Sequence, residues 1–448
     1  MPVIFIHGVN TRYDKDYVKD VAARNELIQR LVLAPLADKY PRLKQIEIVS
    51  PYWGEHGVDF AWNQASVPDV SVLEGLGGGT SGTPKSDLEI METLKELQAT
   101  SQGTTSPLES LGANDNPLKT AATKDLVRFI EAMLMPLILS EMNLLSEIEN
   151  IPEKPQLEDK YRGQQENALK KEGRLEALLS VASLEVATDP DVKKEVAKAS
   201  SDEEVIKLLK KKIQTRFEKL VSPPDTAPTE GGLESLGPGE LENLKDRIGE
   251  IFDRTFNAPK RLATVAALDQ FREGLHSDLS QFLGDVFVYL NERGGKNEPG
   301  PIVSAVLHDI REAIKSKPND EPLIIITHSM GGNILYDILT YYAPELKVDV
   351  WVSVGGQVGQ FEEMKLFKNS NKEIRGPKKV AGLKPVGYWL NVYDPADVLS
   401  FKVAPIFDAV DQDKKFLTGA SALKSHGAYF KRPSFYRMLR EHIEEALS

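Results

Sequence analysis

The residues best suited to chemistry lie around Ser329, in the segment THSMGG at residues 327–332. An apolar run, residues 322–327, ends two residues before the serine, and a helical pattern follows the motif. A serine on a tight turn between a strand and a helix is held above the sheet edge, where its hydroxyl can attack a carbonyl. Gly331 and its neighbour leave room for such a turn, although Thr327 stands where the usual G-x-S-x-G pattern has glycine. The pattern predicts a nucleophile elbow.

A second chemical segment, IFIHGVN at residues 4–10, ends the first apolar run of the chain. Gly8 would let the backbone of this loop approach the serine, so that the N–H of Val9 points into the site. Together with the amide of Met330, it would form an oxyanion hole, which stabilises the negative oxygen of a tetrahedral intermediate. We expect His7 to orient this loop rather than to transfer protons.

A serine hydroxyl is a weak nucleophile and needs a base that is oriented by an acid. Of the seven histidines, His426 fits the base best, because it lies in a Gly-containing loop before the last helical pattern. We expect His328 to be packed with its side chain away from the site. The strand-like run at 388–393 leads into two aspartates. Asp397 is the favoured partner of the histidine, and Asp394, which would stabilise the turn, is the alternative acid.

Strand-like and helix-like segments alternate at both ends of the chain. Such alternation predicts βαβ units and a mainly parallel sheet flanked by helices, which is an α/β fold. The expected strands are 3–6, 46–49, 322–327, 348–354 and 388–393, and the expected helices are 17–40, 302–316, 332–342 and 432–447.

A large segment separates the two halves of this α/β pattern. The catalytic core is expected to be discontinuous, with residues 1–55 and 285–448, and residues 56–284 form a mostly helical insertion. Two Gly/Ser/Pro-rich stretches inside it, 68–120 and 222–240, are typical of linkers. The insertion is a candidate lid or cap that would exclude water from the site. Its charged helices could equally be solvated faces or an interaction module.

Composition narrows the classes of function. The 448-residue chain has a formal net charge of −12 and no cysteine, which argues against a nucleic-acid binder, Cys-ligated zinc and thiol catalysis. No stretch approaches the ~18 apolar residues of a membrane span, and the N-terminus has no export-signal pattern. We therefore expect a cytoplasmic protein without a stable membrane anchor.

Four segments in order, IFIHGVN, ITHSMGGN, NVYDPADV and SHGAYF, resemble those of α/β-hydrolase superfamily serine hydrolases of the lipase/esterase type. The resemblance covers residues 1–55 and about 285–448, whereas the insertion resembles no family. It implies the α/β-hydrolase fold and cleavage of carboxylic esters, often lipid esters, through an acyl-enzyme. It also implies a triad of Ser329, His426 and Asp397 that needs neither a metal ion nor an organic cofactor.

Several alternatives stay open at the level of sequence. The same triad would serve a thioesterase, an amidase or a peptidase, because the site stabilises any tetrahedral acyl intermediate. A catalytically inactive hydrolase core could instead be a scaffold for the insertion. The insertion could also hold the enzyme inactive until a protein partner or transient membrane contact displaces it. The acyl chain, the leaving group and the oligomeric state are not fixed by the sequence.

Overall fold

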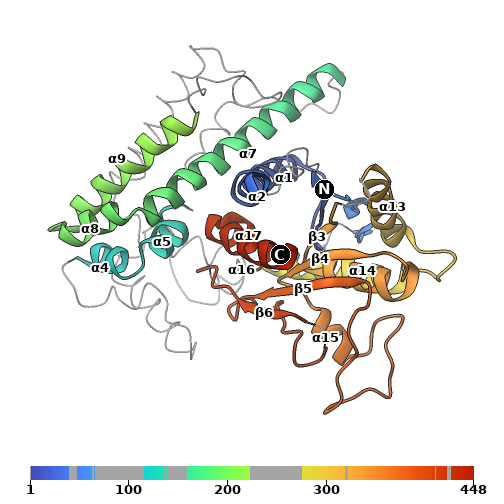
Figure 1. Ribbon diagram of the computed structural model, residues 1–448. Coiled ribbons are helices and arrows are strands. Elements are labelled where there is room, and N and C mark those ends of the chain that lie inside the picture. The colour runs from blue at the N-terminus through green and yellow to red at the C-terminus, as the bar shows by residue number, and fades with distance from the viewer. Residues whose placement is uncertain are drawn as a thin grey trace, which may run out of the picture.

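A sheet of six strands forms the centre of the computed structural model (Figure 1). The strands are β1 (Val3–Ile6), β2 (Ile48–Val49), β3 (Ile324–His328), β4 (Val348–Val354), β5 (Val386–Tyr393) and β6 (Gln412–Lys415). Their order is β2-β1-β3-β4-β5-β6, and every neighbouring pair is parallel. The described residues are 2–39, 48–62, 65, 116–135, 138, 159–221, 275–317, 321–408, 410–420 and 425–448.

The central strands are apolar because helices cover both faces of the sheet. All four residues of β1 are buried, as are six of the seven in β4. The edge strand β6 has the sequence QDKK, and the sequence pattern did not predict it. An edge strand needs no apolar face on its outer side, and charged residues there oppose pairing with other chains.

Two helical layers enclose the sheet. One layer contains α12 (Leu275–Glu292), α13 (Pro301–Ser316), α14 (Met330–Asp337) with its continuation η8 (Ile338–Tyr342), and α15 (Val358–Glu363). The other contains α1 (Lys15–Leu27), continued by η1 (Ile28–Leu33) and α2 (Ala34–Lys39), and the last helix α17 (Pro433–Leu447). The α/β class and the parallel sheet expected from the sequence are thereby confirmed.

The described helices of the insertion share a hydrophobic core of their own. They are α4 (Pro117–Lys124), α5 (Leu126–Phe129), η6 (Ile130–Leu134), α7 (Asp159–Thr188), α8 (Pro190–Lys198) and α9 (Asp202–Val221). The expected linkers at 68–120 and 222–240 lie outside the described residues, except for 116–120, where α4 begins. At the other end, the expected boundary between the insertion and the core, between residues 284 and 285, falls inside α12.

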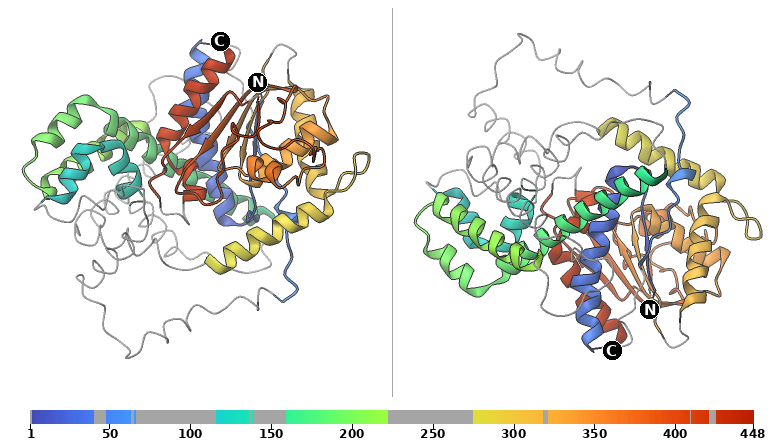
Figure 2. Two further views of the ribbon diagram at one scale, coloured as in Figure 1. Left: turned by 90° about the horizontal axis from the view of Figure 1, so that it is seen from below. Right: turned by 90° about the horizontal axis from the view of Figure 1, so that it is seen from above.

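Helix α7 joins the insertion to the α/β core, as Figure 2 shows where α7 runs beside α1. Gly173 of α7 lies so close to α1 that a Cβ there would be 2.3 Å from the carbonyl oxygen of Lys19. The Lys19 ammonium also forms an ion pair of 2.9 Å with Glu176. Ala177 and Val181 of α7 belong to the core cluster beneath α1 and α17. This part of the insertion is therefore integral to the packing of the core.

The order of the strands determines where a site can form. The chain passes from β1 to β2 on one side, and later returns to β3 on the other side of β1. Loops that leave β1 and β3 at their carboxyl ends therefore diverge, and in open α/β sheets ligands bind in the crevice at such a switch point. The segments IFIHGVN and ITHSMGGN lie at these two strand ends. No helix in the described ranges is both long and apolar enough to span a bilayer.

Candidate active site

Ser329 occupies a strained turn between β3 and α14. Its φ is 53° and its ψ is −127°, a backbone conformation that a residue with a Cβ adopts only when its surroundings enforce it. The serine amide donates to the carbonyl of Val354 at 3.0 Å. A Cβ on Gly331 would lie 2.4 Å from the carbonyl oxygen of Ile6, so glycine is required for helix α14 to approach β1. The turn is thus held by its neighbours on both sides.

The loop after β1 lies directly against this serine. A Cβ on Gly8 would be 2.6 Å from Ser329 Cβ and 3.2 Å from Ser329 Oγ. Within the described part of the chain, neither the amide of Val9 nor that of Met330 donates a hydrogen bond. Met330 begins α14, and the first amides of a helix have no acceptor within it. Both amides expected to form the oxyanion hole therefore lack an acceptor among the described residues.

Asp285 of α12 fixes the loop after β1, a role that the sequence did not reveal. Its fully buried carboxylate accepts hydrogen bonds from the amides of Asn10 at 2.8 Å and Val58 at 2.7 Å. Arg12 donates to both of its oxygens, at 2.8 and 3.2 Å. These partners lie more than 200 residues from Asp285 along the chain, so no local pattern could predict them.

His7 is a structural member of the same loop. Its Nε2 accepts from the amide of Trp53 at 3.1 Å, and its Nδ1 lies 2.7 Å from the carbonyl of Gly8. Because a carbonyl only accepts, Nδ1 carries the hydrogen and the ring is neutral. Burial lowers the pKa of His7 to about 4, and its ring stacks on Trp53 at a centroid distance of 4.8 Å. These contacts fit the expectation that His7 orients the loop.

His426 lies in a short helix, α16 (Ser425–Ala428), and contacts Asp397. Its Nδ1 is 2.9 and 3.1 Å from the two carboxylate oxygens of Asp397. That carboxylate is buried and also accepts from the amide of Leu399 at 2.9 Å and from the hydroxyl of Tyr429 at 3.1 Å. A carboxylate can only accept, so Nδ1 of His426 carries a hydrogen, and in the neutral imidazole Nε2 has the lone pair. The Asp397 carboxylate therefore fixes the orientation of the His426 ring.

Asp394 has a different set of partners. One oxygen accepts from the amide of Ala396 at 2.9 Å, and the other accepts from both the amide and the hydroxyl of Thr418 at 2.8 Å. Its amide donates to the hydroxyl of Tyr429 at 2.8 Å. Asp394 therefore ties the turn to the segment around residue 418, and Asp397 is the aspartate that contacts His426.

His328 packs against the candidate base rather than away from it. Its Nε2 donates to the carbonyl of His426 at 2.8 Å, and the two rings lie 4.7 Å apart. Burial, with a smaller contribution from the charge of His426, lowers the pKa of His328 to about 3. His328 is packed, as expected. Its side chain does not point away from the site, however, but contacts the backbone and ring of His426.

These two buried neutral histidines predict a stability that is sensitive to acid. The unfolded chain binds protons at His7 and His328 below about pH 6.5, whereas the folded protein does so only near pH 4 and 3. Because the unfolded state then binds more protons, the free energy of unfolding should fall as pH is lowered from 7 to 4. In urea titrations, His7→Phe should be less stable at pH 7, and the gap to wild type should narrow at pH 4. A gap that is constant or widens would contradict this.

The ends of β3, β4 and β5 place Ser329, Gly355 and Asp397 at one edge of the sheet, where Asp397 contacts His426. Within the described residues, no hydrogen bond joins His426 to Ser329. Gly355 follows β4 with a φ of 57°, and a Cβ on it would lie 3.2 Å from Asp397 Oδ2 and 3.5 Å from His426 Nδ1. A Cβ on Gly356 would lie 3.8 Å from the carbonyl oxygen of Ser329. Among the described residues, Nε2 of His426 is buried without a hydrogen-bond partner. It is the atom that must take a proton from a serine nucleophile.

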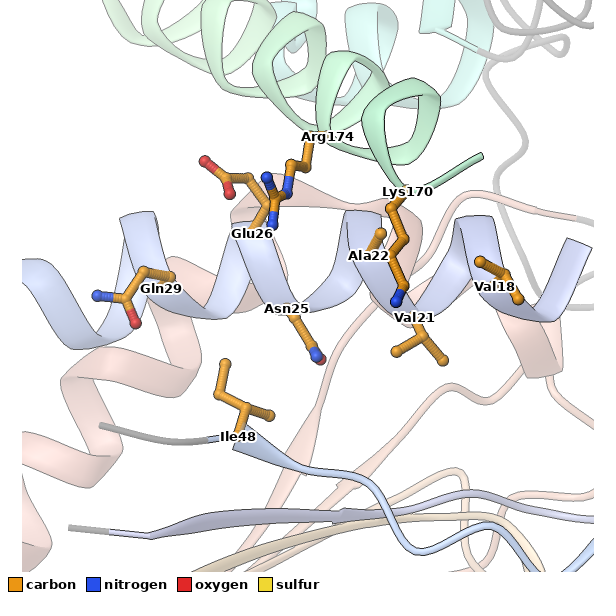
Figure 3. A pocket seen from close by; sticks show the side chains of 9 residues that line it. All are labelled: Val18, Val21, Ala22, Asn25, Glu26, Gln29, Ile48, Lys170 and Arg174. Atoms are coloured by element: carbon orange, nitrogen blue, oxygen red, sulfur yellow. The ribbon is translucent and has the colours of Figure 1, made fainter. Parts of the chain in front are cut away.

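A cavity of about 380 Å³ lies elsewhere, between α1, α7 and the start of β2 (Figure 3). Asn25 and Glu26 of α1 line it opposite Lys170 and Arg174 of α7. None of the candidate catalytic residues lines this cavity. Over the described ranges, no group of three or more His, Asp or Glu side chains is placed to hold a metal ion.

No family model, curated protein or solved structure matches this chain. A function for it must therefore be argued from the geometry of the site and from the resemblance of its four motifs.

Proposed function

We propose that the protein is a serine hydrolase with an α/β-hydrolase fold that cleaves carboxylic esters. One observation carries the proposal: the Asp397–His426 pair lies at the same sheet edge as the strained Ser329, with Gly8 against the serine hydroxyl. A structural turn has no physical need for a buried acid–base pair whose outer nitrogen has no partner in the described part of the chain. Hydrophobic acyl esters, including lipid esters, are the proposed substrates by analogy with the motifs.

The proposed reaction follows from the atoms already described. Ser329 Oγ attacks the ester carbonyl while His426 Nε2 takes its proton, and Asp397 stabilises the imidazolium through Nδ1. The amides of Val9 and Met330 stabilise the tetrahedral oxyanion. His426 then protonates the leaving alcohol, which gives an acyl-enzyme. Water, activated by the same histidine, releases the acid and restores the serine.

We further propose that the insertion acts as a cap next to this site. Glu131 of η6 accepts hydrogen bonds from both the amide and the hydroxyl of Ser434, at 2.8 and 2.5 Å. Arg432 donates to the carbonyls of Glu131 and Thr418, at 2.5 and 2.8 Å. The insertion thus contacts the chain just beyond His426. Because α7 also packs on the core, removing the entire insertion would expose apolar residues of the core.

A panel of acyl esters, thioesters and amides of equal chain length tests the proposed reaction. We expect ester hydrolysis that is absent in Ser329→Ala. Faster turnover of thioesters or amides would favour the alternative acyl-transfer activities. A folded wild type that is inactive on the entire panel would favour the inactive scaffold. We also propose that the protein is located in the cytoplasm and that it contacts a protein partner or a membrane surface.

A further inference from the structure

Gln357 lies at the centre of the candidate site, although no sequence motif pointed to it. It comes three residues after β4 and directly precedes α15. Its side chain is buried, with 4% of the residue exposed. The Nε2 atom of its amide is 3.4 Å from Ser329 Oγ. It thus contacts the proposed nucleophile from the side of β4.

The orientation of the Gln357 amide is fixed by its other partners. Its Nε2 also donates to the carbonyl oxygens of Leu399 at 2.7 Å and of Gly355 at 3.0 Å. The two hydrogens of this NH₂ group thus serve three acceptors, so the longer contact with Ser329 Oγ shares a hydrogen with one of the carbonyls. Carbonyl oxygens only accept hydrogen bonds, so the atom that faces Ser329 must be the NH₂ group. On the other side, Oε1 accepts from Asn333 at 3.4 Å.

An NH₂ group at this position determines which way the serine proton can point. The amide nitrogen has no lone pair to accept a proton, so the hydroxyl of Ser329 can only accept from Gln357. The serine proton is then left for another acceptor. His426 Nε2 is buried, has a lone pair in the neutral imidazole, and has no hydrogen-bond partner among the described residues, Ser329 included.

We propose that Gln357 is a further catalytic residue of this site. Its hydrogen bond directs the serine proton toward His426. As that proton leaves, negative charge develops on Oγ, and hydrogen bonds to a charged oxygen are stronger than those to a neutral one. The contact therefore stabilises the attacking state more than the resting state, and so affects the rate of attack rather than substrate binding. This role rests on the proposed serine hydrolase function.

The test is the rate of fluorophosphonate labelling between pH 5 and 9 for wild type, Gln357→Met and Ser329→Ala. Loss of an oxyanion donor costs about 100-fold or more. Because the contact with Ser329 Oγ is long, we expect a fall of about 10-fold in the high-pH plateau for Gln357→Met. The pH midpoint should not move, because the Asp397–His426 pair is intact. Gln357→Asn should show the same loss, because its shorter side chain cannot bring the amide to Oγ. This variant replaces Gln357→Met in the test if Gln357→Met does not fold.

Gln360→Met is the matched control, since this partly exposed glutamine lies in α15, the helix that Gln357 precedes. It should label like wild type. A plateau for Gln357→Met equal to that of wild type would overturn the role of Gln357 alone. A reduced plateau with a shifted midpoint would also overturn it, because Gln357 would then act through Leu399 and the Asp397 turn. Absence of labelling in folded wild type would overturn the serine hydrolase function itself.

Discussion

Replacing His426 by alanine should lower the rate of ester hydrolysis by about 10⁵-fold or more, because loss of the base in a comparable triad abolishes nearly all its advantage. Only His426 contacts the buried Asp397 carboxylate through Nδ1 and keeps Nε2 buried and unpartnered in the described chain. Without it, no group in this arrangement takes the proton of Ser329. Initial rates on the fastest ester of the panel, and the fluorophosphonate labelling rate, measure the effect.

The control for this substitution is His308→Ala, at an exposed position of α13. It should leave both rates within about twofold of wild type, as surface substitutions away from a site usually do. Circular dichroism and thermal melts ensure that both variants are folded. Retention of a tenth or more of the wild-type rate by folded His426→Ala would rule out this histidine as the base.

Asp397→Asn should lower the rate of hydrolysis by about 10⁴-fold, the size of effect seen when an amide replaces the acid of a triad. The Asp397 carboxylate accepts from His426, Leu399 and Tyr429. An asparagine NH₂ cannot accept, so in place of Oδ2 it would face His426 Nδ1 as a donor. The imidazole would then carry its hydrogen on Nε2, the tautomer that cannot take a proton from Ser329.

Asp394→Asn is the matched comparison, three residues earlier in the same turn. Both of its oxygens accept from main-chain amides or the Thr418 hydroxyl. We expect a stability loss of about 1–3 kcal/mol from the bonds that an amide cannot accept, with a rate reduced less than about 10-fold. Urea unfolding and initial rates separate the two effects. A larger loss of rate in Asp394→Asn than in Asp397→Asn would contradict the assignment of the acid.

The sequence predicted those parts of the fold whose determinants are local. Strands β1 and β4 have the predicted bounds, because each is a short apolar run that ends at polar or glycine residues. Ser329, His426 and Asp397 could be singled out because each lies in a short motif just after a strand or before a helix. The sequence favoured Asp397 over Asp394 as the acid but could not decide between them. The choice depends on which carboxylate faces the histidine, and that is set by the fold.

What the sequence did not predict depends on contacts between distant segments. Strand β6 has no apolar pattern and forms because β5 offers an open edge. Asp285 lies in a helix whose apolar residues are explained by core packing, yet its carboxylate accepts a hydrogen bond from the loop after β1. Gln357 has neither a motif nor a charge, and its proposed role follows only from its contacts with Ser329, Gly355 and Leu399. The packing of α7 on α1 likewise depends on a close approach at Gly173.

The most direct test of an activated serine is fluorophosphonate labelling of the purified protein beside its Ser329→Ala variant, read by intact mass. The strained turn, the Asp397–His426 pair and the approach of Gly8 together predict one adduct on wild type and none on the variant. Peptide mapping should locate the adduct on Ser329. A folded wild type that takes up no adduct, or a variant labelled equally well, would contradict the proposed catalytic site.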